Sequence, residues 1–307
     1  MKGFLFFAGI MGFLLCSTAV AGEPGYQFLT VGVGPGATGM GDSYHARYDI
    51  SAVFVNPAGA GKVNGREMIA GYGDYLQDVG AGFALYGQKI RGIGVVGGGF
   101  LYYNYGDFNG YDDLGNQVKD FAASDLSLFV FGSREIDTRT HVGITLKYIA
   151  STIERYHSSA LAMDLGTIYE PQEDVLVGIS LLNVGMTTNA YDQKKERLPL
   201  SLQVGASKRL SQVPIVIEAD LQEMNRKGNF FSRWSLGAEW QTMDFLFLRA
   251  GYNNLKRQDY DGGSGVAGSL GGLSLGFGLQ HEKYVFEYSV AAQGIGLVNR
   301  FSVRCIL

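Results

Sequence analysis

Residues 273–280 read LSLGFGLQ, and the side chains in this stretch alternate strictly in polarity. On an extended chain, successive side chains point to opposite faces, so one face would be apolar and the other would carry glycine and polar groups. The apolar face would consist of Leu273, Leu275, Phe277 and Leu279. This period of two predicts a β-strand with one apolar face.

The same alternation recurs through most of the chain after residue 65. It gives about fourteen segments, an even number, as is usual for single-chain bacterial barrels. We place these segments near 66–75, 79–88, 92–105, 121–132, 139–151, 158–169, 174–186, 198–209, 213–223, 230–241, 244–253, 269–280, 283–291 and 297–307. Each is long enough for a tilted strand to cross a bilayer, which takes ~9–11 residues.

A half-buried strand of a soluble protein also alternates, so the period alone leaves two fold classes open. Composition favours the membrane: the chain has 45 Gly, 13 % aromatic residues and only 18 % charged residues. Large aromatics near the ends of the apolar faces would form an interfacial girdle. They are Tyr148, Tyr169, Trp234, Trp240, Tyr252 and Tyr284. We therefore predict an all-β fold, a transmembrane antiparallel β-barrel.

The predicted connections also fit a barrel. Several are long, at 106–120, 187–197 and 254–268, and the alternate ones are short, such as 170–173 and 281–282. Outer-membrane barrels have short periplasmic turns and longer extracellular loops. The first connection, 76–78, is short and breaks this pattern.

The N-terminus has the features of an export signal. Lys2 precedes an apolar run from Phe4 to Leu15, and the small residues Ala19-Val20-Ala21 form a cleavage site. The alternative is an N-terminal membrane anchor, but the run is too short to span a bilayer. We predict a signal peptide at 1–21, a plug segment at 22–65 and the barrel at 66–307, in the outer membrane of a Gram-negative-type bacterium.

The segment at 32–61 does not alternate and reads GVGPGATGMGDSYHARYDISAVFVNPAGAG. Gly34, Gly36 and Gly39 match the spacing of a dinucleotide-binding fingerprint. That fingerprint requires a strand before it and a helix after it within a βαβ unit, and this segment lies between a signal peptide and barrel strands. We therefore predict no nucleotide site, and no cofactor elsewhere.

This segment resembles the N-terminal signature of the PorV/PorQ family, whose barrels are related to the FadL-type long-chain fatty acid transporters. The resemblance rests on the motif residues Gly39, Met40, Gly41, Asp49, Asn56, Pro57, Ala58 and Gly59. It extends to the later strands through Leu198–Leu202, Leu248–Tyr252 and Asn299–Ser302. It implies a fourteen-stranded barrel with an N-terminal plug at its periplasmic mouth.

The Asn56-Pro57 pair has two interpretations. Pro57 fixes its own φ and restricts Asn56 to extended geometry, so that the Asn56 amide can bond backbone groups inside the lumen. The pair would then be either a structural turn before the first strand or part of a gate.

Charged residues lie on the polar faces of the predicted strands and would point into the lumen. They are Lys147, Glu218, Asp220, Arg233, Glu239, Arg249, Glu287, Arg300 and Arg304. Buried charges must be paired or hydrated, so we expect ion pairs that anchor the plug rather than a path for charged substrates. The four histidines show no metal-ligand spacing, and whether the acidic loop at 107–113 binds calcium stays open.

Three classes of function are weighed: a transporter of small hydrophobic molecules, a partner in protein secretion, and an enzyme. The net charge of −4 gives no reason to expect a nucleic-acid partner. No Ser, His and acid pattern singles out a hydrolase, so we expect no enzyme. The resemblance implies passage or binding of small hydrophobic molecules across the outer membrane. The alternative it implies is a PorV-like partner of a protein secretion and surface-attachment system.

Overall fold

The structure is a computed structural model that describes residues 24–75, 79–112, 114–191, 195–226, 228, 230–259, 269–293 and 296–307. The signal peptide predicted at 1–21 lies outside these residues.

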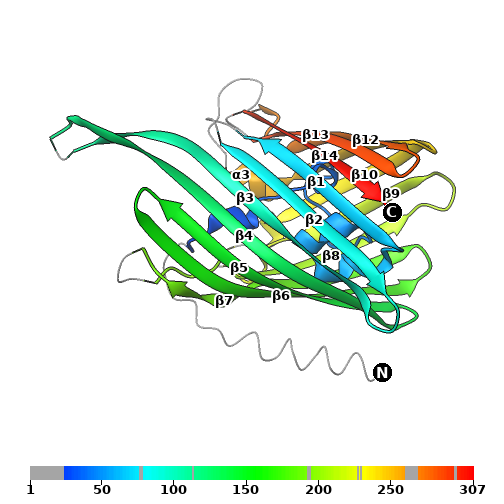
Figure 1. The fold of residues 1–307 in the computed structure, drawn as a ribbon. Helices are drawn as coiled ribbons and strands as arrows, with labels where there is room; N and C mark the ends of the chain where they lie inside the picture. Colours follow the sequence, from blue (N-terminus) through cyan, green and yellow to red (C-terminus); the bar gives the residue numbers. More distant parts are fainter. Residues whose placement is uncertain are drawn as a thin grey trace.

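Fourteen antiparallel strands form a closed barrel in which every strand pairs with its neighbours in the chain (Figure 1). The strands are β1 (Arg66–Asp74), β2 (Gly80–Ile90), β3 (Gly94–Tyr111), β4 (Gln117–Asp137), β5 (Thr140–Ile153), β6 (Tyr156–Gln172), β7 (Val175–Asn189), β8 (Ser201–Arg209), β9 (Ile215–Leu221), β10 (Trp234–Met243), β11 (Leu246–Asn253), β12 (Leu273–His281), β13 (Tyr284–Ala292) and β14 (Leu297–Ile306). The barrel closes where β1 pairs with β14, with Gly73 opposite Arg300. The predicted fold class is confirmed, and each predicted segment overlaps one strand.

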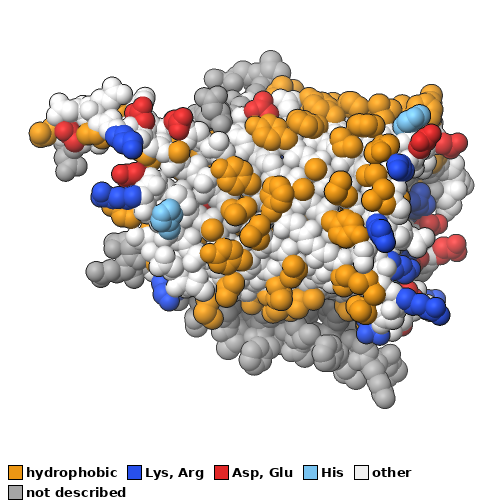
Figure 2. Space-filling model, viewed as in Figure 1, with side chains coloured by type: hydrophobic (Ala, Val, Ile, Leu, Met, Phe, Trp, Pro, Cys, Tyr) orange, Lys and Arg blue, Asp and Glu red, His pale blue; other side chains and the backbone are white. Residues whose placement is uncertain are grey.

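The period of two sorts side chains between outside and inside as predicted. On β12, Leu275 is 61 % exposed, whereas its neighbour Ser274 is buried in the lumen. Trp240 and Tyr148, two of the predicted girdle aromatics, are exposed on the outer surface. Figure 2 shows hydrophobic side chains spread over the middle of the barrel wall, with charged side chains gathered toward its two ends. Such a surface is suited to a lipid bilayer, and a closed barrel leaves no strand edge unpaired there. The chain is therefore an outer-membrane barrel.

The two ends of the barrel differ in their connections. At one end the connections are short, at 91–93, 138–139, 173–174, 210–214, 244–245 and 282–283. At the other end several are longer, at 190–200, 222–233 and 254–272. We call these the short-turn end and the long-loop end. By the rule for bacterial barrels, the short-turn end faces the periplasm.

One predicted loop is wrong. The region 106–120 is mostly strand, because β3 continues to Tyr111 and β4 begins at Gln117. The two strands pair with each other beyond the rim as a projecting ribbon, visible at the left of Figure 1. Two bulges interrupt this pairing. Each bulge breaks the alternation of polar and apolar side chains, so the sequence pattern does not indicate a strand there.

The remaining elements are short helices. Four precede the barrel: η1 (Gln27–Thr30), α2 (Pro35–Gly39), η2 (Ile50–Phe54) and η3 (Pro57–Lys62). η4 (Phe230–Ser232) and α3 (Asn254–Asp259) lie in connections at the long-loop end. Within the described part of the chain, no helix is long and apolar enough to cross a membrane.

Candidate functional site

Residues 24–65, the N-terminal segment, run through the inside of the barrel (Figure 1). At the long-loop end, the Gly25 amide donates to the carbonyl of Arg197 at 3.0 Å. At the short-turn end, Lys62 Nζ lies 3.5 Å from Glu170 Oε2 on β6. The segment therefore extends along the lumen between the two ends, further than the periplasmic mouth where the sequence places it.

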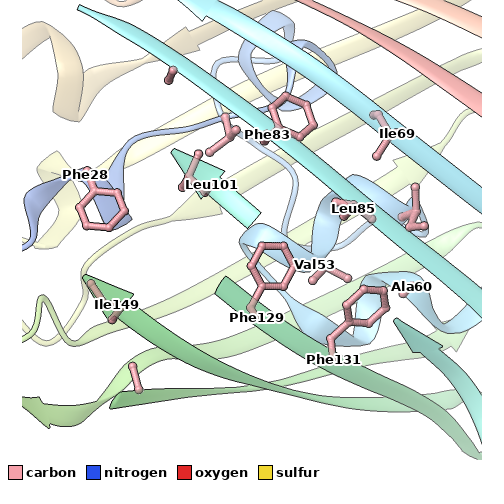
Figure 3. Close-up of a cluster of buried hydrophobic side chains, with 14 of the residues drawn as sticks. Phe28, Val53, Ala60, Ile69, Phe83, Leu85, Leu101, Phe129, Phe131 and Ile149 are labelled. Carbon is pink, nitrogen blue, oxygen red and sulfur yellow. The ribbon is translucent and has the colours of Figure 1, made fainter. Parts of the chain in front are cut away.

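One wall of the lumen is apolar. Side chains of β1 to β6 pack on Phe28, Ile50 and Val53 of the segment, as Figure 3 shows. The wall residues of this cluster include Ile69, Phe83, Leu85, Leu101, Phe129, Phe131 and Ile149. Phe54 joins the cluster by edge-to-face contacts with the rings of Phe83 and Phe129, both at 5.5 Å. This half of the lumen therefore resembles the core of a soluble protein, and it fixes the segment by burial of apolar area.

Glycines on the wall allow the segment to approach closely. A Cβ atom added to six of them would collide with segment atoms, and one added to Gly276 would come within 3.1 Å of the Gly39 Cα atom. They are Gly143, Gly166, Gly178, Gly205, Gly237, Gly251 and Gly276, and among them Gly251 meets Gly41, Gly237 meets Met40, and Gly166 meets Asn56. At these positions glycine is needed because a side chain would keep the segment away from the wall, and not because the backbone has to be flexible.

The inward side chains of β9 bind the backbone of residues 42–46. Asp220 Oδ2 accepts from the Tyr44 amide at 2.8 Å and from His45 Nδ1 at 2.6 Å. Glu218 Oε1 accepts from the Ala46 amide at 2.7 Å, and Gln222 Nε2 donates to the carbonyl of Asp42 at 3.2 Å. Both carboxylates are thus bonded by backbone N–H groups that would otherwise be buried without partners.

The predicted lumen charges on β10, β11 and β13 form one network. Glu239 binds Arg47 of the segment and also accepts from Arg249 Nε at 2.6 Å. Arg249 reaches Glu287 Oε1 at 2.7 Å. The segment thus supplies one cation to a network that spans the wall.

A second ion pair joins the segment to β14. Arg304 donates to Asp49 Oδ2 at 2.6 Å. Burial by itself would raise the pKa of the Asp49 carboxyl, but Arg304 and the hydrogen bonds from Ser51 lower this pKa to about 2. Asp49 also caps η2, because its side chain accepts from the Ser51 amide.

The other predicted lumen charges are also paired inside the barrel. Lys147 Nζ lies 2.6 Å from Asp164 Oδ2 on β6. Arg300 donates to the Tyr75 hydroxyl at 3.0 Å, and Arg233 donates to the carbonyls of Glu223 and Arg226. All nine predicted lumen charges therefore lie inside the barrel.

The Asn56-Pro57 pair lies where three strands meet the segment. Asn56 is fully buried, caps η3 by accepting from the Ala58 amide, and donates through Nδ2 to the carbonyls of His45 and Thr167. Pro57 and Ala58 pack on Gly143 of β5. The Ala58 carbonyl accepts from the Ser133 hydroxyl of β4, and the Gly59 carbonyl accepts from the Asp49 amide. The motif residues Gly39, Met40 and Gly41 lie at the opposite wall, against β10 to β12.

Two cavities lie along the segment. The outer cavity, of about 170 Å³, is at the long-loop end. Its lining combines apolar side chains, which include Val31, Phe54, Leu101, Phe129 and Leu182, with charged ones such as Asp42, Lys147 and Lys256. The inner cavity, of about 240 Å³, is at the short-turn end. Its lining is polar and includes Arg47, Asp49, Glu239, Arg249 and Arg304. The outer cavity thus combines apolar and charged side chains, whereas the inner cavity is lined largely by charged ones.

Several residues of the site were missed in the sequence. Asp42, His45 and Arg47 bind Lys256, Asp220 and Glu239 respectively. Their signal was present, because three charged or titratable side chains within six residues of a segment enclosed by a barrel need partners on the wall. In the described ranges, no group of three or more His, Cys, Asp or Glu side chains is placed to hold a metal ion.

No protein-family model matches the sequence, and no curated protein matches it. Solved structures do resemble the barrel. The CymD monoaromatic hydrocarbon channel superposes with a TM-score of 0.63 at 13 % identity, covering 90 % of this chain and 98 % of that one. The Pseudomonas putida toluene transporter TodX gives a TM-score of 0.60 at 12 % identity, covering 89 % and 96 %. A Pseudomonas aeruginosa FadL homologue gives 0.54 at 11 % identity, covering 89 % and 98 %. At these identities the likeness is one of fold: the chain shares its barrel fold with these three structures.

Proposed function

We propose that this barrel passes small hydrophobic molecules across the outer membrane. The observation that carries the proposal is the outer cavity, a space inside a closed barrel at its extracellular end, with Val31, Phe54, Leu101, Phe129 and Leu182 as its apolar lining residues. Its volume of about 170 Å³ is close to that of an engineered apolar cavity of about 150 Å³ that binds benzene. The likeness in fold to CymD, a monoaromatic hydrocarbon channel, and to TodX, a toluene transporter, supports a ligand of this size.

The N-terminal segment is the second part of the proposal. It lies between the outer and inner cavities, so a molecule that crosses the barrel has to pass it. We infer that the segment is a plug, held by the Asn56-Pro57 pair, by the Asp49–Arg304 pair and by the network around Arg249. Paired charges anchor the plug, and the barrel acts by passage rather than by catalysis.

The finer resemblance, to the PorV/PorQ members, remains a proposal. The solved structures of similar fold reported above are two hydrocarbon channels and a FadL homologue. A role as a secretion partner therefore has no structural support, and passage of a small molecule is the function we put to test.

The test is uptake of radiolabelled toluene by bacterial cells that lack hydrocarbon channels and express this chain. We expect faster uptake than in cells without the barrel. Leu101→Trp would fill part of the outer cavity and should slow uptake, whereas Ile144→Trp, on the outer face, should not. Both variants are first checked for heat-modifiable migration, so that a misfolded barrel is not scored. Equal uptake with and without the barrel would reject the proposal.

A further inference from the structure

The ribbon formed by β3 and β4 leaves the barrel. The β2 partner of β3 ends where Gly80 pairs with Asn104, and the β5 partner of β4 ends where Ala123 pairs with Ile153. Beyond these points, β3 and β4 pair with each other as far as Tyr111 and Gln117. An isolated two-stranded ribbon is marginally stable in water, and this one has two open edges above the membrane.

A bulge sets which side chains face the mouth of the barrel. Tyr103 and its partner Asp125 are buried on the lumen side, and the Tyr105 hydroxyl donates to Asp125 at 2.6 Å. β3 then contains one extra residue between Asn104 and Asp107, with Gly106 at φ 77°. Because of this residue, Phe108 rather than Asp107 lies opposite Phe121. Both phenylalanines therefore continue the lumen-facing side of the wall.

Aromatic rings continue along this side into the lumen. The Phe108 and Phe121 rings are stacked at 5.3 Å, and those of Tyr105 and Tyr103 are stacked at 6.3 Å. Tyr103 touches Phe28 edge-to-face, and the next residues inward, Leu101 and Phe129, line the outer cavity. Exposure falls along this path, from 42 % at Phe108 to 3 % at Tyr103.

A ring pair needed only to stabilise the ribbon could lie on either of its faces. The bulge instead places the pair on the face that leads to the outer cavity. Phe108 remains substantially exposed there, which costs free energy in water unless another apolar group covers it.

We propose that Phe108, Phe121 and Tyr105 form a capture surface for small planar aromatic molecules, which then move along the ring path to the outer cavity. This inference rests on the proposed passage function and adds the place of first contact and its preference for a ring over a saturated molecule. Offset or edge-to-face stacking favours a ring over a saturated molecule of equal size. The Tyr105 hydroxyl is already bonded to Asp125, so the surface recognises the ring rather than a polar substituent.

The experiment compares uptake of toluene and methylcyclohexane, which are similar in size and differ in having a π system. Three variants are used: Phe108→Ala/Phe121→Ala, Phe108→Leu/Phe121→Leu, and Asp107→Ala on the opposite face as the matched control. At low concentration we expect the parent barrel to favour toluene by about three- to tenfold, in line with the strength of aromatic pairs. Both double variants should lose this preference through a higher KM at unchanged maximal rate, and Asp107→Ala should keep it.

Two results would overturn the inference while the passage function stands. One is toluene uptake in the Ala/Ala variant equal to that of the parent. The other is full retention of the preference in the Leu/Leu variant, which would show that apolar area suffices. If the parent takes up neither compound faster than cells without the barrel, the proposed function itself fails.

Discussion

The side-chain amide of Asn56 donates to the backbone carbonyl of Thr167 on β6 at 3.1 Å and so ties the N-terminal segment to the barrel wall. The same amide donates to the carbonyl of His45 at 2.8 Å. One side chain therefore satisfies a carbonyl of the segment and a carbonyl of the wall together.

Replacing Asn56 by Ala should loosen the segment without unfolding the barrel. The buried carbonyls would lose their donor at a cost of ~1–3 kcal/mol, which is small against fourteen paired strands. We expect higher single-channel conductance in planar bilayers, with normal abundance and heat modifiability. Pro57→Gly should act in the same direction by restoring roughly 0.4–1 kcal/mol of backbone freedom to the released state. The control is Asn116→Ala in the exposed ribbon turn. If Asn56→Ala and Pro57→Gly both stay as closed as the parent, the pair is only a structural turn.

A methyl group at Gly251 should displace the segment. The added Cβ would overlap the backbone of Met40 and Gly41, and neither backbone can move without leaving the wall. We expect Gly251→Ala to increase amide hydrogen exchange in peptides covering residues 35–50, measured by mass spectrometry. Gly82→Ala is the matched control, because a Cβ there meets no atom within 4 Å. Equal exchange in the two variants would argue against a tight fit.

An arginine on the lipid face should impair membrane insertion. Leu275 is exposed on the outer face of β12, and a cation at mid-bilayer costs ~2–4 kcal/mol. Leu275→Arg should reduce the heat-modifiable fraction recovered from outer membranes, whereas Leu275→Phe should not. Normal recovery of Leu275→Arg would place this residue outside the bilayer.

Acid should weaken the anchoring of the segment. The pKa of Asp49 is lowered from an ordinary 3.8 to about 2, so the ion pair with Arg304 stabilises the docked state fully above pH 4. This stabilisation, about 2 kcal/mol, is lost as the pH falls through the folded pKa. Bilayer conductance should therefore rise between pH 4 and pH 2 in the parent. Asp49→Asn should already be elevated at pH 7 and should change little over that range. A parent conductance that is flat down to pH 2 would contradict this assignment.

The barrel could be predicted from the sequence because its signal is local. Within each strand, the alternation of polarity indicates which side chains face outward and which face inward, as Leu275 and Ser274 illustrate. Closure into a barrel follows from the apolar outer faces. The ribbon was missed because a bulge at Gly106 shifts the phase, so the alternation on its two sides does not align.

The interior of the barrel could be predicted only in part. The alternating pattern of β9 placed Glu218 and Asp220 in the lumen. Their partners Ala46 and His45, however, lie more than 170 residues away in sequence. No local period encodes such a contact, because it is set by how the segment threads the closed wall. The resemblance supplied the importance of Asn56, and only the structure supplied its two carbonyl partners.

The path of the N-terminal segment has a consequence for biogenesis. The segment enters near Arg197 at the long-loop end and reaches β1 at the opposite end, with its backbone seated against glycines of the surrounding wall. A chain held in this way cannot be pulled lengthwise through a finished cylinder, because Met40 and Tyr44 would have to slide past the wall. We therefore expect the seam between β1 and β14 to close after the segment is in place. Variants that weaken the docking of the segment should then also slow this final closure.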